Sequence, residues 1–85
     1  MPKAFSEEVS HFGRKVRKLR LQKKMTQQIL ADACEVDIRT IQRIERGNYG
    51  CGLHLVFALA KALDCTASKL VALPSKEKIR ASKNH

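Results

Sequence analysis

Aromatic residues are scarce in this 85-residue chain, which has three phenylalanines, one tyrosine and no tryptophan. Proteins that bind single-stranded nucleic acid stack its bases on such rings, so we do not expect that mode of binding. The chain also lacks any run of about 18 apolar residues, which excludes a membrane-spanning helix. Its two prolines stand at positions 2 and 74, so no proline interrupts a helix between them.

Cysteine and histidine are too few and too scattered for a metal site or a catalytic group. The cysteines are odd in number and lack C-x-x-C spacing: Cys34, Cys51 and Cys65. The histidines, at positions 11, 54 and 85, have no nucleophile or carboxylate pair at useful spacing. No glycine-rich phosphate-binding loop is present. We therefore expect no enzyme activity, no metal and no cofactor.

Acidic residues are outnumbered: eight Asp and Glu oppose 17 Lys and Arg, which gives a net charge of +9. A domain this basic attracts polyanions, and nucleic acid is the commonest such partner. An acidic membrane surface or an acidic protein would respond to the same field, so charge alone does not choose among them. The first ten residues, MPKAFSEEVS, contain no apolar segment of the kind found in signal peptides, and we expect a cytoplasmic protein.

Apolar residues recur at helical spacing, and no run alternates apolar and polar residues as a strand would. The first helix is expected to begin near Ser6, with an apolar stripe at Val9, Phe12, Val16 and Leu19. Between positions 14 and 24 it carries seven cations and no acid, which favours contact of some of them with phosphate over a merely solvated face. Gly13 costs this helix about 1 kcal/mol relative to Ala, so we expect it to permit a close contact.

Four shorter helices are expected to follow. Thr26 is a good cap for a second helix, TQQILADA, and Asp37 for a third, after a turn at Glu35 and Val36. The loop GNYGCG leads to an apolar fourth helix, LHLVFALAKAL, and ASKLVAL makes the fifth before Pro74. The fourth helix is predicted to bury Leu53, Val56, Leu59, Ala60 and Leu63. We predict a compact all-α domain of five helices over residues 1–74 and a basic, flexible tail over residues 75–85.

The second and third helices are predicted to form a helix-turn-helix, because a tight turn joins them and the third opens with polar and charged residues. From Phe12 to Leu73 the sequence resembles the Cro/CI-type (XRE-like) helix-turn-helix domain of phage repressors and small bacterial regulators. Three segments carry the resemblance: FGRKVRKLR, MTQQILADACEVDIRTIQRIERG and LVFALAKALDCTASKL. The resemblance implies a lambda-repressor-like fold in a transcriptional regulator, most simply a repressor, encoded by a bacterium or a phage.

The resemblance further implies that the third helix enters the major groove of double-stranded DNA. By position, the residues that would face the bases are Ile38, Arg39, Gln42 and Arg43. Arginine can donate to guanine O6 and N7, glutamine can pair with adenine, and isoleucine can touch a thymine methyl group. From position or from the run of cations, the residues expected near phosphate are Thr26, Gln27, Asn48, Tyr49, Arg14 and Lys15. An ion pair between Arg20 and Glu45 would fix the angle of the reading helix.

Some of these residues have alternative interpretations. Ile38 can equally belong to the edge of the core, Arg43 can pair with a carboxylate, and Tyr49 can pack under the glycine-rich loop. Glu35 stands in a turn position where the family commonly has glycine. The left-handed conformation expected there costs a non-glycine residue on the order of 1 kcal/mol.

One such domain reads only a few base pairs, so the resemblance also implies a homodimer on a palindromic operator. Its two reading helices would meet successive major grooves about 34 Å apart. The expected dimer surface comprises Leu70, Val71 and Leu73. An antitoxin or a restriction-modification controller protein has the same fold and is the alternative. Such a protein could act partly through a toxin or other protein partner, for which Ile29 and Ile38 would form an apolar patch.

Overall fold

The computed structural model describes residues 7–72, and in this range it contains five α-helices and no β-strand. Their bounds are α1 Glu7–Gln22, α2 Gln27–Cys34, α3 Ile38–Glu45, α4 Leu53–Ala62 and α5 Ala67–Val71. The predicted all-α class with five helices is confirmed. The expected start near Ser6 and the expected tail at 75–85 lie outside the described residues.

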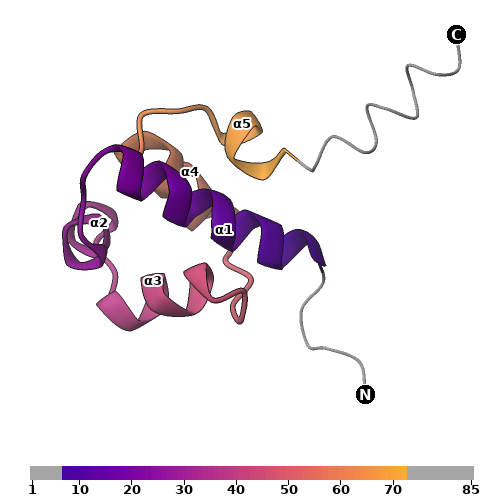
Figure 1. Cartoon of the computed structure of the whole chain (residues 1–85), viewed down its shortest axis with the longest axis horizontal. Helices are drawn as coiled ribbons and strands as arrows, with labels where there is room; N and C mark the ends of the chain where they lie inside the picture. Colours follow the sequence, from indigo (N-terminus) through magenta and orange to yellow (C-terminus); the bar gives the residue numbers. More distant parts are fainter. Residues whose placement is uncertain (1–6, 73–85) are drawn as a thin grey trace, which may run out of the picture.

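The longest helix, α1, runs across the middle of the molecule (Figure 1). α3 packs along one side of α1 and α5 along another, while α4 passes behind it (Figure 1). α2 contacts both α3 and α4, and α5 packs on α4. Because α3 packs chiefly against α1 and α2, it lies at the edge of the molecule with one side uncovered by the other helices (Figure 1).

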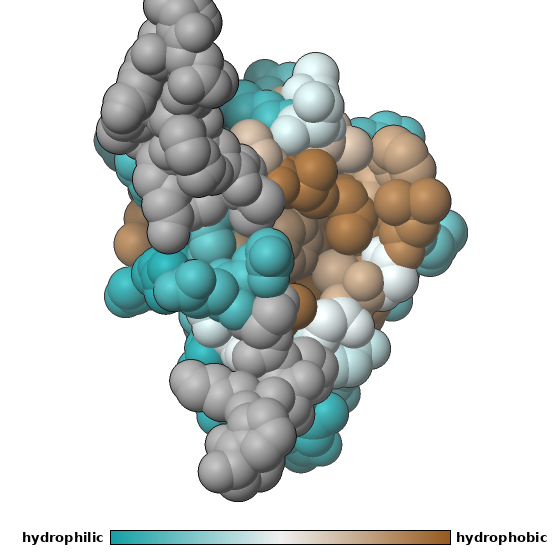
Figure 2. All heavy atoms as spheres, turned by 90° about the vertical axis from the view of Figure 1, so that its right-hand side faces the viewer, coloured by the Kyte–Doolittle hydropathy of each residue, from teal (hydrophilic) through white to brown (hydrophobic). Residues whose placement is uncertain are grey.

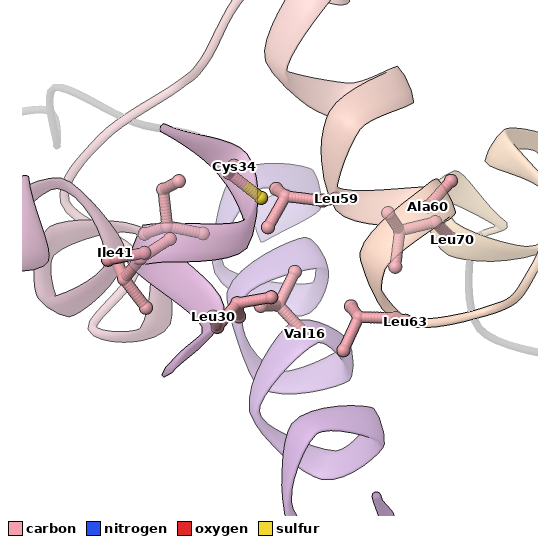
Figure 3. Close-up of a cluster of buried hydrophobic side chains, with 10 residues drawn as sticks. Val16, Leu30, Cys34, Ile41, Leu59, Ala60, Leu63 and Leu70 are labelled. Atoms are coloured by element: carbon pink, nitrogen blue, oxygen red, sulfur yellow. The ribbon is translucent and has the colours of Figure 1, made fainter. Parts of the chain in front are cut away.

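The core is made of aliphatic side chains contributed by all five helices and their ends (Figure 3). The largest of them expose less than 2% of their surface: Val16, Leu30, Ile41, Ile44, Leu59, Leu63 and Leu70. Burying one such side chain contributes about 1.5–3 kcal/mol. Since helices of five to ten residues are not stable alone in water, this cluster is what holds α2 to α5 in place.

Two leucines do not lie where the sequence predicted. Leu53, expected in the core, is 69% exposed because it is the first residue of α4 and lies beside Gly52, around which no described residue packs. Leu70, expected at a dimer surface, is fully buried because the short α5 closes the core with it. Val71 is half exposed, and Leu73 lies outside the described residues.

Side-chain caps open α2 and α3, and one left-handed residue turns the chain between these helices. Thr26 Oγ1 accepts from Ile29 N at 3.0 Å, and Asp37 Oδ1 accepts from Arg39 N at 2.8 Å. Glu35 has φ 59° and ψ 44°, so its expected left-handed conformation is confirmed. This conformation satisfies the C-terminal carbonyls of α2 and turns the chain toward α3.

Gly13 brings α1 and α3 into close contact. A Cβ atom at this position would lie 2.0 Å from the carbonyl oxygen of Ile44, so no larger residue fits unless one helix moves. The close contact expected from the sequence is confirmed. It sets the distance between α1 and the C-terminal half of α3.

Candidate nucleic-acid interface

The uncovered side of α3 is charged. Arg39 and Arg43 are exposed and Gln42 is half-buried, whereas Ile41 and Ile44 lie in the core. Residues four apart lie one above the other on a helix, so the two arginines form a row along α3. Their guanidinium groups, with five N–H donors each, are therefore available to a partner on this side of the molecule.

Ile38 is partly buried and packs against the core. Of the two interpretations that the sequence left open, the structure favours the edge of the core. Ile29, with which it was expected to form an apolar patch, is 49% exposed. Of the two residues, Ile29 therefore offers more apolar surface to a partner.

Arg20 and Glu45 join α1 to the end of α3. Arg20 Nε donates to Glu45 Oε2 at 2.6 Å, and Arg20 Nη2 donates to Glu45 Oε1 at 3.0 Å. The third nitrogen, Nη1, donates to the carbonyl oxygen of Met25 at 2.9 Å, which ties down the segment before α2. The side chains of Arg20 and Glu45 are only 8% and 4% exposed. A two-bond pair of this kind is strongly directional, so it fixes α3 relative to α1.

Gln27, the first residue of α2, extends this network to a second residue of α3, Gln42. Its Nε2 donates to Glu45 Oε1 at 3.1 Å, and its Oε1 accepts from Gln42 Nε2 at a longer 3.5 Å. The chain Arg20–Glu45–Gln27–Gln42 thus links three helices by side chains alone. None of these contacts is local in sequence, since the partners are 15 to 25 residues apart.

A polar hollow opens beside this network. It is lined by Arg17, Gln27, Gln42, Glu45 and Arg46. The sequence reasoning did not single out Arg17 or Arg46, although both are exposed here. Arg17 precedes Arg20 by three residues and Arg46 follows Glu45, so the ion pair brings the two arginines to the same hollow. The expected Arg20–Glu45 ion pair could therefore have predicted that Arg17 and Arg46 lie close together.

Three more residues expected near phosphate lie at or near this side of the molecule. Thr26 is exposed and caps α2, next to Gln27 at the hollow. Asn48 and Tyr49 are exposed in the loop directly after α3, where Asn48 N donates to the Arg43 carbonyl oxygen at 2.9 Å. The loop that carries both residues therefore begins at the end of the row of arginines on α3.

The two cations expected near phosphate on α1 are separated by the fold. Arg14 is exposed and lies one turn before Arg17, on the side of the polar hollow. Lys15 Nζ instead donates to the carbonyl oxygen of Lys69 in α5 at 3.3 Å. Because Lys15 and Arg17 are two residues apart, they point to nearly opposite sides of α1. The structure therefore does not bring Lys15 to the side formed by α3.

The three cysteines are free thiols: Cys34, Cys51 and Cys65. Burial raises the pKa of the Cys34 and Cys51 thiols, and a charge on Cys51 would raise that of Cys34 further. Both therefore stay protonated at neutral pH, and a protonated thiol is a poor nucleophile and metal ligand. Between residues 7 and 72, no three His, Cys, Asp or Glu side chains are grouped as a metal site would require. None of the helices in that range is both long and apolar enough to cross a membrane.

An apolar hollow lies on another face of the molecule, near the N-terminal end of α1 (Figure 2). It is lined by Glu8, Val9, Phe12, Gly50, Cys51, Val56 and Val71. Two more apolar side chains on α4, Leu53 and Phe57, are 69% and 56% exposed. A gathering of exposed apolar side chains of this kind is typical of a protein–protein contact.

Comparison with known proteins agrees with this geometry. A helix-turn-helix family model matches residues 16–70. The competence pilus inhibition repressor of Acinetobacter baylyi is 39% identical over 61 residues, which cover 72% of this chain and 56% of that protein. The chain thus spans little more than half the length of this relative.

Solved structures of restriction-modification controller proteins are also similar. C.AhdI from Aeromonas hydrophila is 31% identical with a TM-score of 0.74, over 76% of this chain and 98% of that one. C.Esp1396I is 28% identical with a TM-score of 0.71, over 76% and 86% of the respective chains.

Proposed function

Because this chain belongs to the Cro/CI-type (XRE-like) helix-turn-helix family of DNA-binding transcriptional regulators, we propose that it reads a specific double-stranded operator through α3. The observation that carries the proposal is the uncovered, arginine-bearing side of α3. Its position is fixed by the Arg20–Glu45 pair and by the contact at Gly13. A helix held rigidly at the edge of the molecule can enter a major groove, which is about 12 Å wide.

We assign base reading to the outward residues of α3. Arg39 and Arg43 donate to guanine O6 and N7, and Gln42 pairs with adenine. Ile38 touches a thymine methyl group with the part of its side chain that the core leaves exposed. The exposure of both arginines supports their assignment, since neither takes part in an ion pair within residues 7–72.

Phosphate contacts flank the reading helix. We assign them to Thr26, Gln27, Asn48, Tyr49 and Arg14, and add Arg17 and Arg46 because they line the polar hollow. Cations around α3 neutralise phosphates on both sides of the groove and release condensed counterions. Lys15 is not included, because it contacts α5 on the opposite side of α1.

We further propose that two copies bind a palindromic operator as a homodimer, joined through the apolar face formed by α1, α4 and α5. Val71 and the exposed Leu53 and Phe57 would be covered in the dimer. Among residues 7–72, those that line the apolar hollow include no Lys or Arg. Two copies of a chain with net charge +9 therefore meet there with less repulsion than at any cationic face.

Repression is the mode of regulation that the similar Acinetobacter protein supports, since that protein is named a repressor. The similarity to two restriction-modification controller proteins supports a second possibility, control of a restriction-modification system. An antitoxin acting through a protein partner is a third, and Ile29 offers it an apolar contact. A toxin or restriction gene beside this one would distinguish the alternatives.

Selection of bound sites from random duplex DNA at two salt concentrations tests the proposal. We expect a preferred site with twofold symmetry that persists at the higher salt. Binding that ignores sequence and vanishes with added salt would reduce the interaction to phosphate electrostatics alone.

A further inference from the structure

We propose that Gln27 orients the side-chain amide of Gln42, so that the Gln42 carbonyl oxygen faces the DNA and selects a base that presents an amino group in the major groove, above all adenine. The inference rests on the proposed function, because it assumes that α3 reads bases. It makes Gln27 a positioning residue for specificity, in addition to its proposed phosphate contact. The direction of each hydrogen bond in the chain Arg20–Glu45–Gln27–Gln42 carries the inference.

The chain of hydrogen bonds is anchored at the Arg20–Glu45 pair, in which Arg20 can only donate and Glu45 can only accept. Arg20 donates to both carboxylate oxygens of Glu45, at 2.6 and 3.0 Å. A guanidinium has donors and no acceptor, and an ionised carboxylate has acceptors and no donor. With side-chain exposures of 8% and 4%, neither group can turn to water instead. Glu45 is therefore always the acceptor of the hydrogen bonds it makes.

Glu45 then fixes the amide of Gln27. Gln27 lies 3.1 Å from Glu45 Oε1, and only its Nε2 can donate to that oxygen. The opposite orientation would place the Gln27 carbonyl oxygen against a carboxylate oxygen, with no proton between them. In the favourable orientation Gln27 Oε1 faces away from Glu45 and toward Gln42.

Gln27 in turn fixes the amide of Gln42. The atom 3.5 Å from Gln27 Oε1 must be a donor, so it is Gln42 Nε2. One hydrogen of this Nε2 is directed to Gln27, while the second hydrogen and the carbonyl oxygen Oε1 remain for a base. At 3.5 Å the contact is long for a hydrogen bond, yet it still favours one amide orientation over the reverse.

The remaining donor and acceptor of Gln42 match adenine. Adenine presents a donor at N6 and an acceptor at N7 in the major groove, so Oε1 and the second Nε2 hydrogen can pair with both. Cytosine offers only the N4 donor, which satisfies Oε1 alone. Guanine presents two acceptors, N7 and O6, which leave Oε1 without a donor. The expected order is therefore adenine, then cytosine, with guanine and thymine disfavoured.

Relative affinities for a set of operator duplexes, with all four base pairs substituted at each position, test the inference. Gln42→Met identifies the base pair that Gln42 reads, as the position at which preference is lost. In the wild-type protein we expect adenine there to be favoured over guanine by roughly 5- to 150-fold, the range for one two-bond contact. Gln27→Met should reduce this preference several-fold at the same position and at no other. If Gln27→Met also removes a phosphate contact, all duplexes bind more weakly by the same factor, and this factor cancels in the ratio of the affinities for the adenine and guanine duplexes.

Gln28→Met is the matched control, since Gln28 is the exposed neighbour of Gln27 and its side chain donates to Asp32 Oδ1, at 2.9 Å, within α2. It should leave the preference unchanged. A second measurement needs no DNA: the ¹⁵N side-chain amide signals of Gln42 should shift in Gln27→Met and not in Gln28→Met.

Three results would overturn the inference. They are a preference for guanine at the position lost in Gln42→Met, an unchanged preference in Gln27→Met, and Gln42 amide signals that ignore Gln27→Met. A wild-type protein with no sequence preference at any position would overturn the proposed function as well, so the two failures can be told apart.

Discussion

Glu45 accepts two hydrogen bonds from Arg20, at 2.6 Å from Nε and at 3.0 Å from Nη2, and thereby joins the end of α3 to α1. A third bond to Glu45 comes from Gln27 at the start of α2. One nearly buried carboxylate thus connects α3 to both helices that support it.

Arg20→Met should destabilise the fold by about 3–5 kcal/mol, because it leaves the Glu45 carboxylate buried without its cation. The measurement is the free energy of unfolding in urea. Lys23→Met is the matched control: Lys23 pairs with Asp64 at 3.3 Å, but their side chains are 42% and 84% exposed. Its loss should cost less than about 1 kcal/mol. Equal costs for the two variants would show that burial does not strengthen the Arg20 pair.

Gly13→Ala should destabilise the fold although alanine favours a helix by about 1 kcal/mol. The new Cβ would meet the Ile44 carbonyl oxygen, so α1 and α3 must move apart, at a net cost of about 1–3 kcal/mol. Thermal unfolding measures this. Gly52→Ala is the control, since nothing lies within 4 Å of a Cβ there, and it should change stability by less than about 1 kcal/mol. A stabilised Gly13→Ala protein would contradict the close contact.

Arg39→Ala should weaken binding to the selected operator by about 1–3 kcal/mol more than binding to random DNA, because a base contact is lost. Titration of both duplexes at the same salt concentration gives the two affinities. Lys61→Ala removes an exposed cation from α4 and should affect both duplexes equally and slightly. If Arg39→Ala weakens both duplexes equally, Arg39 contacts phosphate and reads no base.

Val71→Glu should shift the protein from dimer to monomer, because it places a charge in the proposed apolar contact. Sedimentation velocity, alone and with operator DNA, measures the change. Leu21→Glu is the control: Leu21 is 51% exposed, against 50% for Val71, but it lies at the other end of α1. A wild-type protein that stays monomeric even on operator DNA would contradict the dimer itself.

Stability should fall as the pH rises above about 8.5, the ordinary pKa of a free thiol. Burial raises the pKa of the Cys34 and Cys51 thiols in the folded state, so the unfolded chain releases these protons first. The folded state then binds more protons than the unfolded state, and the free energy of unfolding decreases with pH. Urea unfolding between pH 8 and 10 should show a smaller decrease in Cys51→Ala than in wild type. Leu53→Ala, which removes no titrating group, should keep the wild-type slope.

The sequence by itself determined the helices and the turn between α2 and α3. Thr26 and Asp37 cap helices because their side chains accept from backbone N–H groups two or three residues away, which is a local interaction. Apolar spacing assigned Val16, Ile41 and Ile44 to the core for the same local reason. The Arg20–Glu45 pair, 25 residues apart, was available only through the resemblance to a family.

Tertiary structure decided what depends on how the helices dock. Apolar spacing predicted an apolar side for α4 and for α5. Which residues on these sides reach the core depended on how the helices pack, and the packing left Leu53 exposed and buried Leu70. Docking of α1 on α3 also brought Arg17 and Arg46 to one hollow and turned Lys15 toward α5. The contact of Gln27 with Gln42 has the same origin. Such contacts join side chains that are far apart in the chain, and only the packing of one helix against another sets the distance between them.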